Sequence, residues 1–87
     1  MQLEDYFDFL PSGEIRLRNH RIGIEDVLYE YIYNEMTPGD LAARFPSLTL
    51  EEVYAVLLYY HRNQMIMDAY IADWLAFGDE MRAEQEA

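Results

Sequence analysis

The side chains best suited to metal chemistry or proton transfer in this 87-residue chain are its two histidines, His20 and His61. A zinc or iron site needs three or four His, Cys or carboxylate ligands at suitable spacing. The chain has no cysteine, and neither histidine has a second one near it in the sequence. We therefore expect no metal and no cofactor, with His20 in a turn and His61 on a helix, at its surface or partly buried.

The sequence also indicates no residue suited to act as a nucleophile or as a general acid or base. Ser12 stands in a Pro-Ser-Gly turn and Ser47 follows a proline, so neither occupies the strand-to-helix elbow of a hydrolase nucleophile. The acidic pairs at 25–26 and 51–52 fall in the first turns of expected helices, where the helix dipole accounts for them. The four glycines form no phosphate-binding motif. We expect a protein with no catalytic residue that is not an enzyme.

The charge of the chain limits its partners. Seventeen acids against six arginines give a formal charge of −11, which disfavours phosphate backbones and anionic membranes. Three of the arginines, Arg16, Arg18 and Arg21, fall in one short segment. They either pair with nearby carboxylates on a solvated strand face or, together with Arg62, contact nucleic acid or an acidic surface.

The N-terminal half contains two periodic patterns. Apolar and charged residues alternate over 14–22, which predicts a short strand or hairpin there. From Ile24 onward the apolar residues recur at helical spacing, and acids occupy the first turn. This pattern predicts a helix over about 24–35.

Two further helices carry recognisable start signals. Thr37 followed by Pro38 predicts a short helix over 38–45, and Thr49 with Glu52 forms a capping-box pattern that predicts a helix over 50–62. A short helix, a turn and a longer helix have the outline of a helix-turn-helix. The expected outward face of the longer helix carries one positive charge and consists of Glu52, Ala55, Tyr59 and Arg62.

The last segment, 64–87, predicts a C-terminal amphipathic helix with one apolar and aromatic face. Aromatic residues on such a face are typical anchors of protein interfaces, although the same face could pack on the core of the protein itself. Gly78 and the acidic residues 79–87 suggest a frayed end. The expected partner-binding residues are Tyr70, Trp74, Phe77, Met81 and Arg82.

Tyr29 and Tyr33 lie four residues apart on the helix over 24–35, away from its main apolar stripe. Their rings either pack against the N-terminal segment, which contains Tyr6, Phe7 and Phe9, or form a contact with a second copy or another partner. Dimerisation would help so small a domain, because a chain of this length buries a limited share of its surface.

Together these patterns predict one mainly α domain over 1–87, a small helical bundle with a helix-turn-helix-like core. Its expected parts are an N-terminal segment (1–13), a short β-hairpin (14–22), a helical core (24–63) and the C-terminal helix (64–87). The acidic N-terminus does not resemble a signal peptide, and no run of about 18 apolar residues occurs, so we expect a cytoplasmic protein without a membrane span.

The segment from Ile15 to Tyr70 resembles domain-of-unknown-function family 433, small bacterial proteins that include antitoxins paired with PIN-like toxins. The resemblance rests on residues 21–28, on Met-Thr-Pro at 36–38 and above all on Phe-Pro-Ser-Leu-Thr-Leu-Glu-Glu-Val at 45–53. The family's entry segment has the pattern Gly-x-Pro-x-Ile-x-Gly-Thr-Arg-Ile. Residues 13–22 lack its proline, second glycine and threonine, and Glu35 replaces the usual glycine before Met36.

The resemblance implies a helix-turn-helix-like bundle with an N-terminal hairpin, usually dimeric, that neutralises a ribonuclease-like toxin and can repress its own operon. The leading hypothesis is therefore an antitoxin whose C-terminal helix fills a groove on a PIN-like toxin while Arg82 reaches acidic groups in the toxin's active site. Two alternatives stay open: a DNA-binding regulator, disfavoured for the isolated acidic protein, and a dimeric scaffold for another protein.

Overall fold

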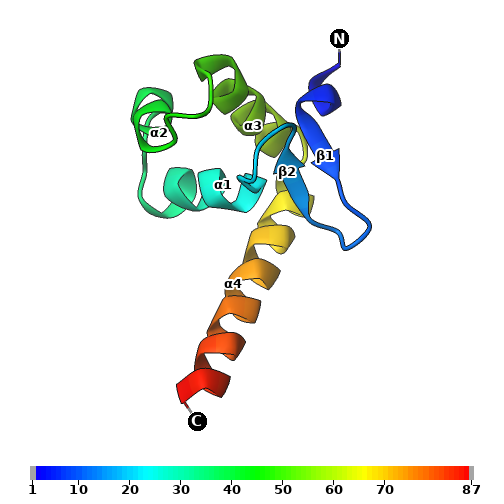
Figure 1. Cartoon of the computed structure of the whole chain (residues 1–87), viewed down its shortest axis with the longest axis vertical. Coiled ribbons are helices and arrows are strands. Elements are labelled where there is room, and N and C mark those ends of the chain that lie inside the picture. The colour runs from blue at the N-terminus through cyan, green and yellow to red at the C-terminus, as the bar shows by residue number, and fades with distance from the viewer. Residues whose placement is uncertain (1, 87) are drawn as a thin grey trace.

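A single 3-10 turn and a two-stranded antiparallel sheet precede four helices in the computed structural model, which describes residues 2–86 and, within α4, side chains as far as Gly78. Figure 1 shows the first three helices gathered beside the sheet, with the fourth extending away from them. The elements are η1 (Leu3–Tyr6), β1 (Phe7–Phe9), β2 (Ile15–Leu17), α1 (Ile24–Tyr33), α2 (Pro38–Arg44), α3 (Leu50–Arg62) and α4 (Gln64–Glu86).

The hairpin expected within 14–22 is present, but its first strand comes from the segment that precedes this range. Phe7 pairs with Leu17 and Phe9 with Ile15, while residues 18–22 form a turn closed by a 3.0 Å hydrogen bond from the amide of Leu17 to the carbonyl of Ile22. A strand of three residues is too short for its alternation to be recognised in the sequence. Burial of the Phe7 side chain holds it in place.

The hydrophobic core lies where β2, α1, α2 and α3 meet. Every helix contributes to it, and α4 does so through the buried Met67 and Ile71 in its first two turns and the partly buried Leu75 in the next. The apolar residues that recur at helical spacing along α3, Val53, Val56, Leu57 and Tyr60, are all buried. The fully buried side chains of the first three helices are Ile24, Val27, Leu28, Leu41, Val53 and Val56.

Capping interactions set the starts of α2 and α3 where the sequence predicted them. The Thr49 hydroxyl accepts from the amide of Glu52 (3.1 Å) and the Glu52 carboxylate accepts from the amide of Thr49 (2.8 Å). Thr37 and Asp40 form the same pair of bonds at α2. Such reciprocal bonds satisfy amide groups that have no partner within the helix.

The end of α1 comes two residues earlier than the sequence predicted. The chain leaves the helix through Glu35, whose φ of +52° lies in the left-handed region. The amide of Met36 then donates to the carbonyl of Glu30, six residues earlier (3.3 Å), and this bond closes the turn at the end of the helix. Glycine is the usual residue at this position, because a Cβ makes the left-handed conformation unfavourable.

The outward face predicted for α3 is wrong in three of its four residues. Ala55 is buried, Glu52 and Tyr59 are half-buried, and only Arg62 is exposed. The reason is the N-terminal segment, which the sequence left unassigned: β1 packs on this side of α3, with the Phe7 ring 5.2 Å from the ring of Tyr59. The exposed residues of α3 are instead Leu50, Glu51, Tyr54, Leu58, His61 and Arg62.

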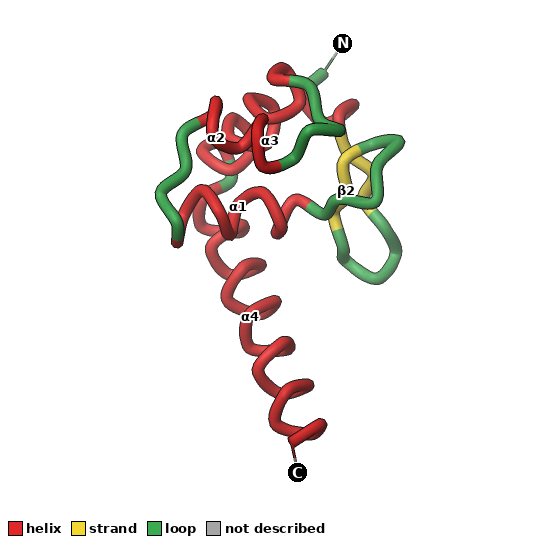
Figure 2. Tube along the Cα trace, turned by 60° about the vertical axis from the view of Figure 1, so that its left-hand side comes forward, coloured by secondary structure: helices red, strands yellow, loops and turns green. Residues whose placement is uncertain are grey.

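The outer part of α4 projects beyond the other elements, as Figures 1 and 2 both show. The molecule measures 46 × 28 × 25 Å, and this helix accounts for its long axis. Within the described residues, no helix combines the length and the apolar character that a membrane crossing requires.

Candidate partner-binding surface

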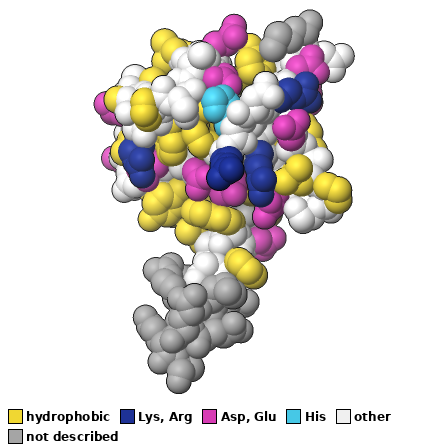
Figure 3. Space-filling view, viewed as in Figure 1, with side chains coloured by type: hydrophobic (Ala, Val, Ile, Leu, Met, Phe, Trp, Pro, Cys, Tyr) yellow, Lys and Arg dark blue, Asp and Glu magenta, His cyan; other side chains and the backbone are white. Residues whose placement is uncertain are grey.

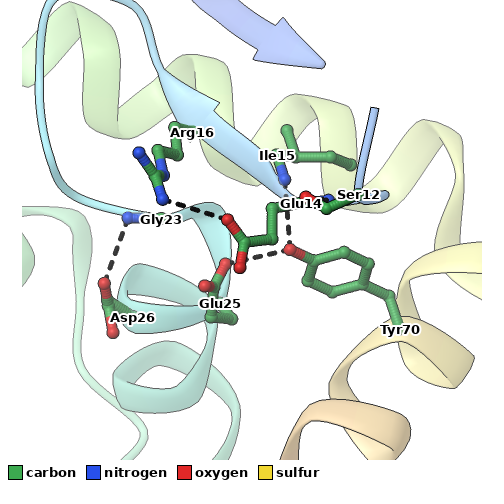
Figure 4. A network of polar contacts seen from close by, with 8 residues as sticks. All are labelled: Ser12, Glu14, Ile15, Arg16, Gly23, Glu25, Asp26 and Tyr70. Atoms are coloured by element: carbon green, nitrogen blue, oxygen red, sulfur yellow. Dashed lines mark hydrogen bonds and ion pairs between the residues drawn. The ribbon is translucent and has the colours of Figure 1, made fainter. Parts of the chain in front are cut away.

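Tyr70 anchors α4 to two other elements at the point where this helix leaves the core (Figure 4). Its hydroxyl accepts a hydrogen bond from the amide of Ile15 on β2 and donates one to the Glu25 carboxylate on α1, both at 3.1 Å. The amide of Gly23 donates to Asp26 (3.0 Å), which caps α1 beside this contact. The half-buried phenol thus fixes the direction of α4 relative to the sheet.

The protonation states of this contact follow from its burial. Desolvation raises the pKa of Tyr70 to about 12, although the bond from Ile15 opposes the shift. Desolvation also raises the pKa of the Glu25 carboxyl, against the lowering effect of hydrogen bonds from its own backbone and from Tyr70. The tyrosine therefore stays neutral at physiological pH and acts as a donor to the carboxylate.

Four aromatic residues form a continuous surface across α1 and α4, called here the aromatic face: Tyr29, Tyr33, Trp74 and Phe77. The ring of Tyr29 meets the ring of Trp74 edge-on at 5.9 Å and lies 5.3 Å from the ring of Tyr33. Trp74 is 36% exposed, Tyr33 54% and Phe77 62%, so apolar rings remain in contact with water. Aromatic clusters of this kind are typical of protein interfaces.

A shallow depression of about 280 Å³ opens beside the aromatic face, between α4 and the loop of the hairpin. Aromatic side chains line it together with the acidic residues Glu14 and Asp73. Such a surface suits an apolar side chain whose neighbours on the partner are basic. The lining residues are Ser12, Gly13, Glu14, Tyr70, Asp73, Trp74 and Phe77.

The structure brings together three of the five residues expected to bind a partner. Tyr70, Trp74 and Phe77 line one depression, but the Tyr70 hydroxyl is already hydrogen-bonded within the chain. The side chains of Met81 and Arg82 lie outside the part of the chain that the structure describes.

Tyr29 and Tyr33 do not pack on the N-terminal segment, so that interpretation of the sequence was wrong. Phe7 and Phe9 pack instead against Tyr59, while Tyr29 lies between Tyr33 and Trp74 of α4. No sequence signal pairs these tyrosines with α4, because the contact depends on the angle at which α4 crosses α1.

The arginines of the hairpin region are partly engaged with acids of the same chain. Arg16 pairs with Glu14 (3.0 Å), and Arg18 pairs with Asp8 (3.1 Å) while donating to the carbonyl of Phe7 (3.2 Å). Arg21 is exposed and makes no ion pair with a described residue. Figure 3 shows basic and acidic side chains interspersed on this face of the molecule. The mixed charge fits a solvated surface better than a phosphate-binding patch.

Each histidine side chain has one polar partner among the described residues. His20 pairs with the half-buried Glu52 (2.9 Å), and His61 lies 3.2 Å from the hydroxyl of Tyr31. Desolvation alone would raise the pKa of Glu52, but the Thr49 amide and His20 hold it below its usual value. Among the described residues, no group of three metal-binding side chains comes together.

The family model described as "Protein of unknown function (DUF433)" matches residues 11–60, which cover β2, α1, α2 and all but the last two residues of α3. No curated protein and no solved structure matches the chain. The matched region ends before α4, so the family model covers only the Tyr29 and Tyr33 part of the aromatic face.

Proposed function

The chain belongs to the DUF433 family, and from this premise we propose that it is a cytoplasmic, non-catalytic, antitoxin-like protein that binds and neutralises a PIN-like, ribonuclease-type toxin. The observation that carries the proposal is the aromatic face at the base of a projecting helix. Exposed rings of Trp74 and Phe77 cost free energy in water, which burial against a partner would recover.

The residues of the surface have distinct roles in this proposal. Trp74 and Phe77 enter an apolar groove of the toxin, and Tyr33 extends the contact onto α1. Tyr70 acts indirectly, because its hydrogen bonds hold α4 at the angle at which the rings of Trp74 and Phe77 face the toxin. Met81 and Arg82 continue the contact toward the end of α4, where Arg82 would reach acidic groups of the toxin's active site.

The first test identifies the partner. The tagged full-length protein is recovered from its native host at moderate salt, and stoichiometric companions are identified by mass spectrometry. A small nuclease-like protein that is toxic when expressed alone and silent when co-expressed would support the proposal. Recovery of this chain without any toxic companion would contradict it.

A substitution then tests the aromatic face itself. Trp74→Ala should weaken toxin binding by about 2 kcal/mol or more, roughly 30-fold, because a central aromatic anchor is removed. Met65→Ala is the matched control, since Met65 is also exposed on α4 but lies nine residues, or half a turn, away around the helix. Equal affinities of the two folded variants would contradict the assignment of the surface.

A DNA-binding regulator is the second candidate, favoured by the α2–α3 arrangement. However, the exposed side of α3 carries Leu50, Tyr54 and Leu58 with the acidic Glu51 in its first turn. Major-groove recognition uses polar and basic side chains. Operator binding by the isolated protein, measured across a salt series, separates the two candidates, because a regulator must bind with a steep salt dependence.

A further inference from the structure

α3 exposes a row of apolar side chains on the side opposite the core. Leu50, Tyr54 and Leu58 are 50%, 54% and 46% exposed, although none of them is near a chain terminus. Their spacing of four residues places them in one line along the helix. A row of three large apolar side chains on one exposed helix face is the kind of surface that another helix covers.

Opposite charges stand at the two ends of this row. Glu51 lies in the first turn of α3 and Arg62 in the last, and both side chains are exposed. Eleven residues are three helical turns plus about 20°, so both charges lie at the same edge of the row. About 16 Å of helix separates them, which prevents their pairing within one chain.

This arrangement is complementary to itself. If a second α3 runs antiparallel and is related by a two-fold axis, Tyr54 of each copy faces Leu58 of the other. The same axis brings Glu51 of each copy to Arg62 of the other, so that two equivalent ion pairs flank an apolar centre. We propose that two copies of this chain dimerise through α3 in this antiparallel arrangement.

The surroundings of the row offer more area for the same contact. Arg62 borders an apolar depression with Met65 and Ile66, which are among the most exposed apolar side chains described. On its other side, a hollow of about 570 Å³ between η1 and α3 gives room for side chains of the second copy. It is lined by Gln2, Leu3, Glu4, Tyr6, Leu58 and Arg62.

The two kinds of contact have different tasks. The apolar row supplies the stabilisation, which must exceed the repulsion between two chains of formal charge −11 each. The ion pairs are exposed and individually weak, and they select the antiparallel register over a parallel one, which would place like charges together. The interface would occupy α3 and thereby withdraw it from DNA, while the aromatic face on α1 and α4 stays free.

Two tyrosines of equal exposure provide a matched test. Tyr54 and Tyr33 are each 54% exposed on a helix, but only Tyr54 lies on the proposed interface. Sedimentation equilibrium of the full chain should give twice the monomer mass for the parent protein and for Tyr33→Lys, and the monomer mass for Tyr54→Lys. Leu58→Glu, checked for folding by circular dichroism, should be monomeric as well. A monomeric parent, or a dimer lost in Tyr33→Lys and kept in Tyr54→Lys, would overturn the proposal.

Charge exchange tests the register. Glu51→Arg or Arg62→Glu alone places like charges together at both ends and should raise the dimer dissociation constant about tenfold. The double variant Glu51→Arg/Arg62→Glu restores both pairs and should return the constant to within about threefold of the parent. Additive weakening in the double variant would overturn the antiparallel arrangement. None of these results depends on a toxin, so this proposal and the antitoxin assignment can fail separately.

Discussion

The inner and outer parts of α4 belong to one continuous helix but have different surroundings. Around Met67 and Ile71 one face of the helix packs on the core, and the Tyr70 hydroxyl is bonded to two other elements. At Trp74 and Phe77, within the next two turns, the aromatic side chains of the helix are in contact with water except where Tyr29 touches the indole. The hydrophobic stripe of a helix can therefore serve stability in one part and recognition in the next.

The largest effect that would sharpen this comparison is expected at Ile71. Ile71→Ala should lower the free energy of unfolding by about 2–4 kcal/mol, because it leaves a cavity among buried side chains. Phe77→Ala removes a larger side chain but should cost less than about 0.5 kcal/mol, because its ring is mostly in water. Urea unfolding of both variants gives the comparison, and similar losses would mean that the outer part of α4 is as structural as the inner part.

Tyr70→Phe should have the next largest effect, a loss of about 1–3 kcal/mol in stability. The variant keeps the ring but leaves the Ile15 amide and the Glu25 carboxylate without their shared partner. Thermal unfolding measures the loss, and toxin affinity measured in parallel should also fall if Tyr70 orients the aromatic face. An unchanged melting temperature would show that water replaces the Tyr70 hydroxyl without loss of stability.

A change in the turn between α1 and α2 provides a contrast to those in α4. Glu35→Gly should raise stability by about 1 kcal/mol, because glycine adopts the left-handed backbone conformation without the Cβ penalty. The increase should appear in the urea midpoint without any change in toxin affinity. Destabilisation would instead mean that the flexibility glycine adds to the unfolded chain outweighs the relief of strain.

The smallest effect is a pH dependence at the base of α4. Burial raises the pKa of Glu25 above its ordinary value of 4.5, so the folded state binds this proton more tightly than the unfolded state. The ionised carboxylate therefore disfavours folding increasingly as the pH rises from 4.5 through the folded pKa. The Glu25→Gln variant lacks this pH-dependent destabilisation. Its free energy of unfolding should therefore rise relative to that of the parent protein over the same pH interval. Parallel curves of stability against pH would contradict the shift.

The sequence predicted the elements whose signals are local. The capping box at Thr49 and the proline at the start of α2 gave the starts of both helices, and α3 was predicted over the observed residues. The pairing of β1 with β2 was missed because β1 has only three residues. The contact of Tyr29 with Trp74 joins residues 45 positions apart, and no local pattern encodes it. The exposed face of α3 was wrong for the same reason, since the segment covering Ala55 and Tyr59 had no predicted structure.

Two departures from the family pattern acquire a physical meaning in the structure. Asn19 and Glu35 stand where the family usually has glycine, and they are the two non-glycine residues with positive φ among those described, at +68° and +52°. Both backbone turns are therefore kept without the residue that forms them most easily. Asparagine tolerates this conformation better than glutamate does, so Glu35 is the more strained of the two.

The contact of Tyr70 also makes α4 a lever. Phe77 lies seven residues beyond this tyrosine, about 10 Å along the helix axis. A tilt of about 10° at the pivot would displace the Phe77 ring by about 2 Å, enough to remove a side chain from a fitted pocket. Two hydrogen bonds at the base of the helix therefore determine how accurately Trp74 and Phe77 are positioned, although neither bond involves these residues.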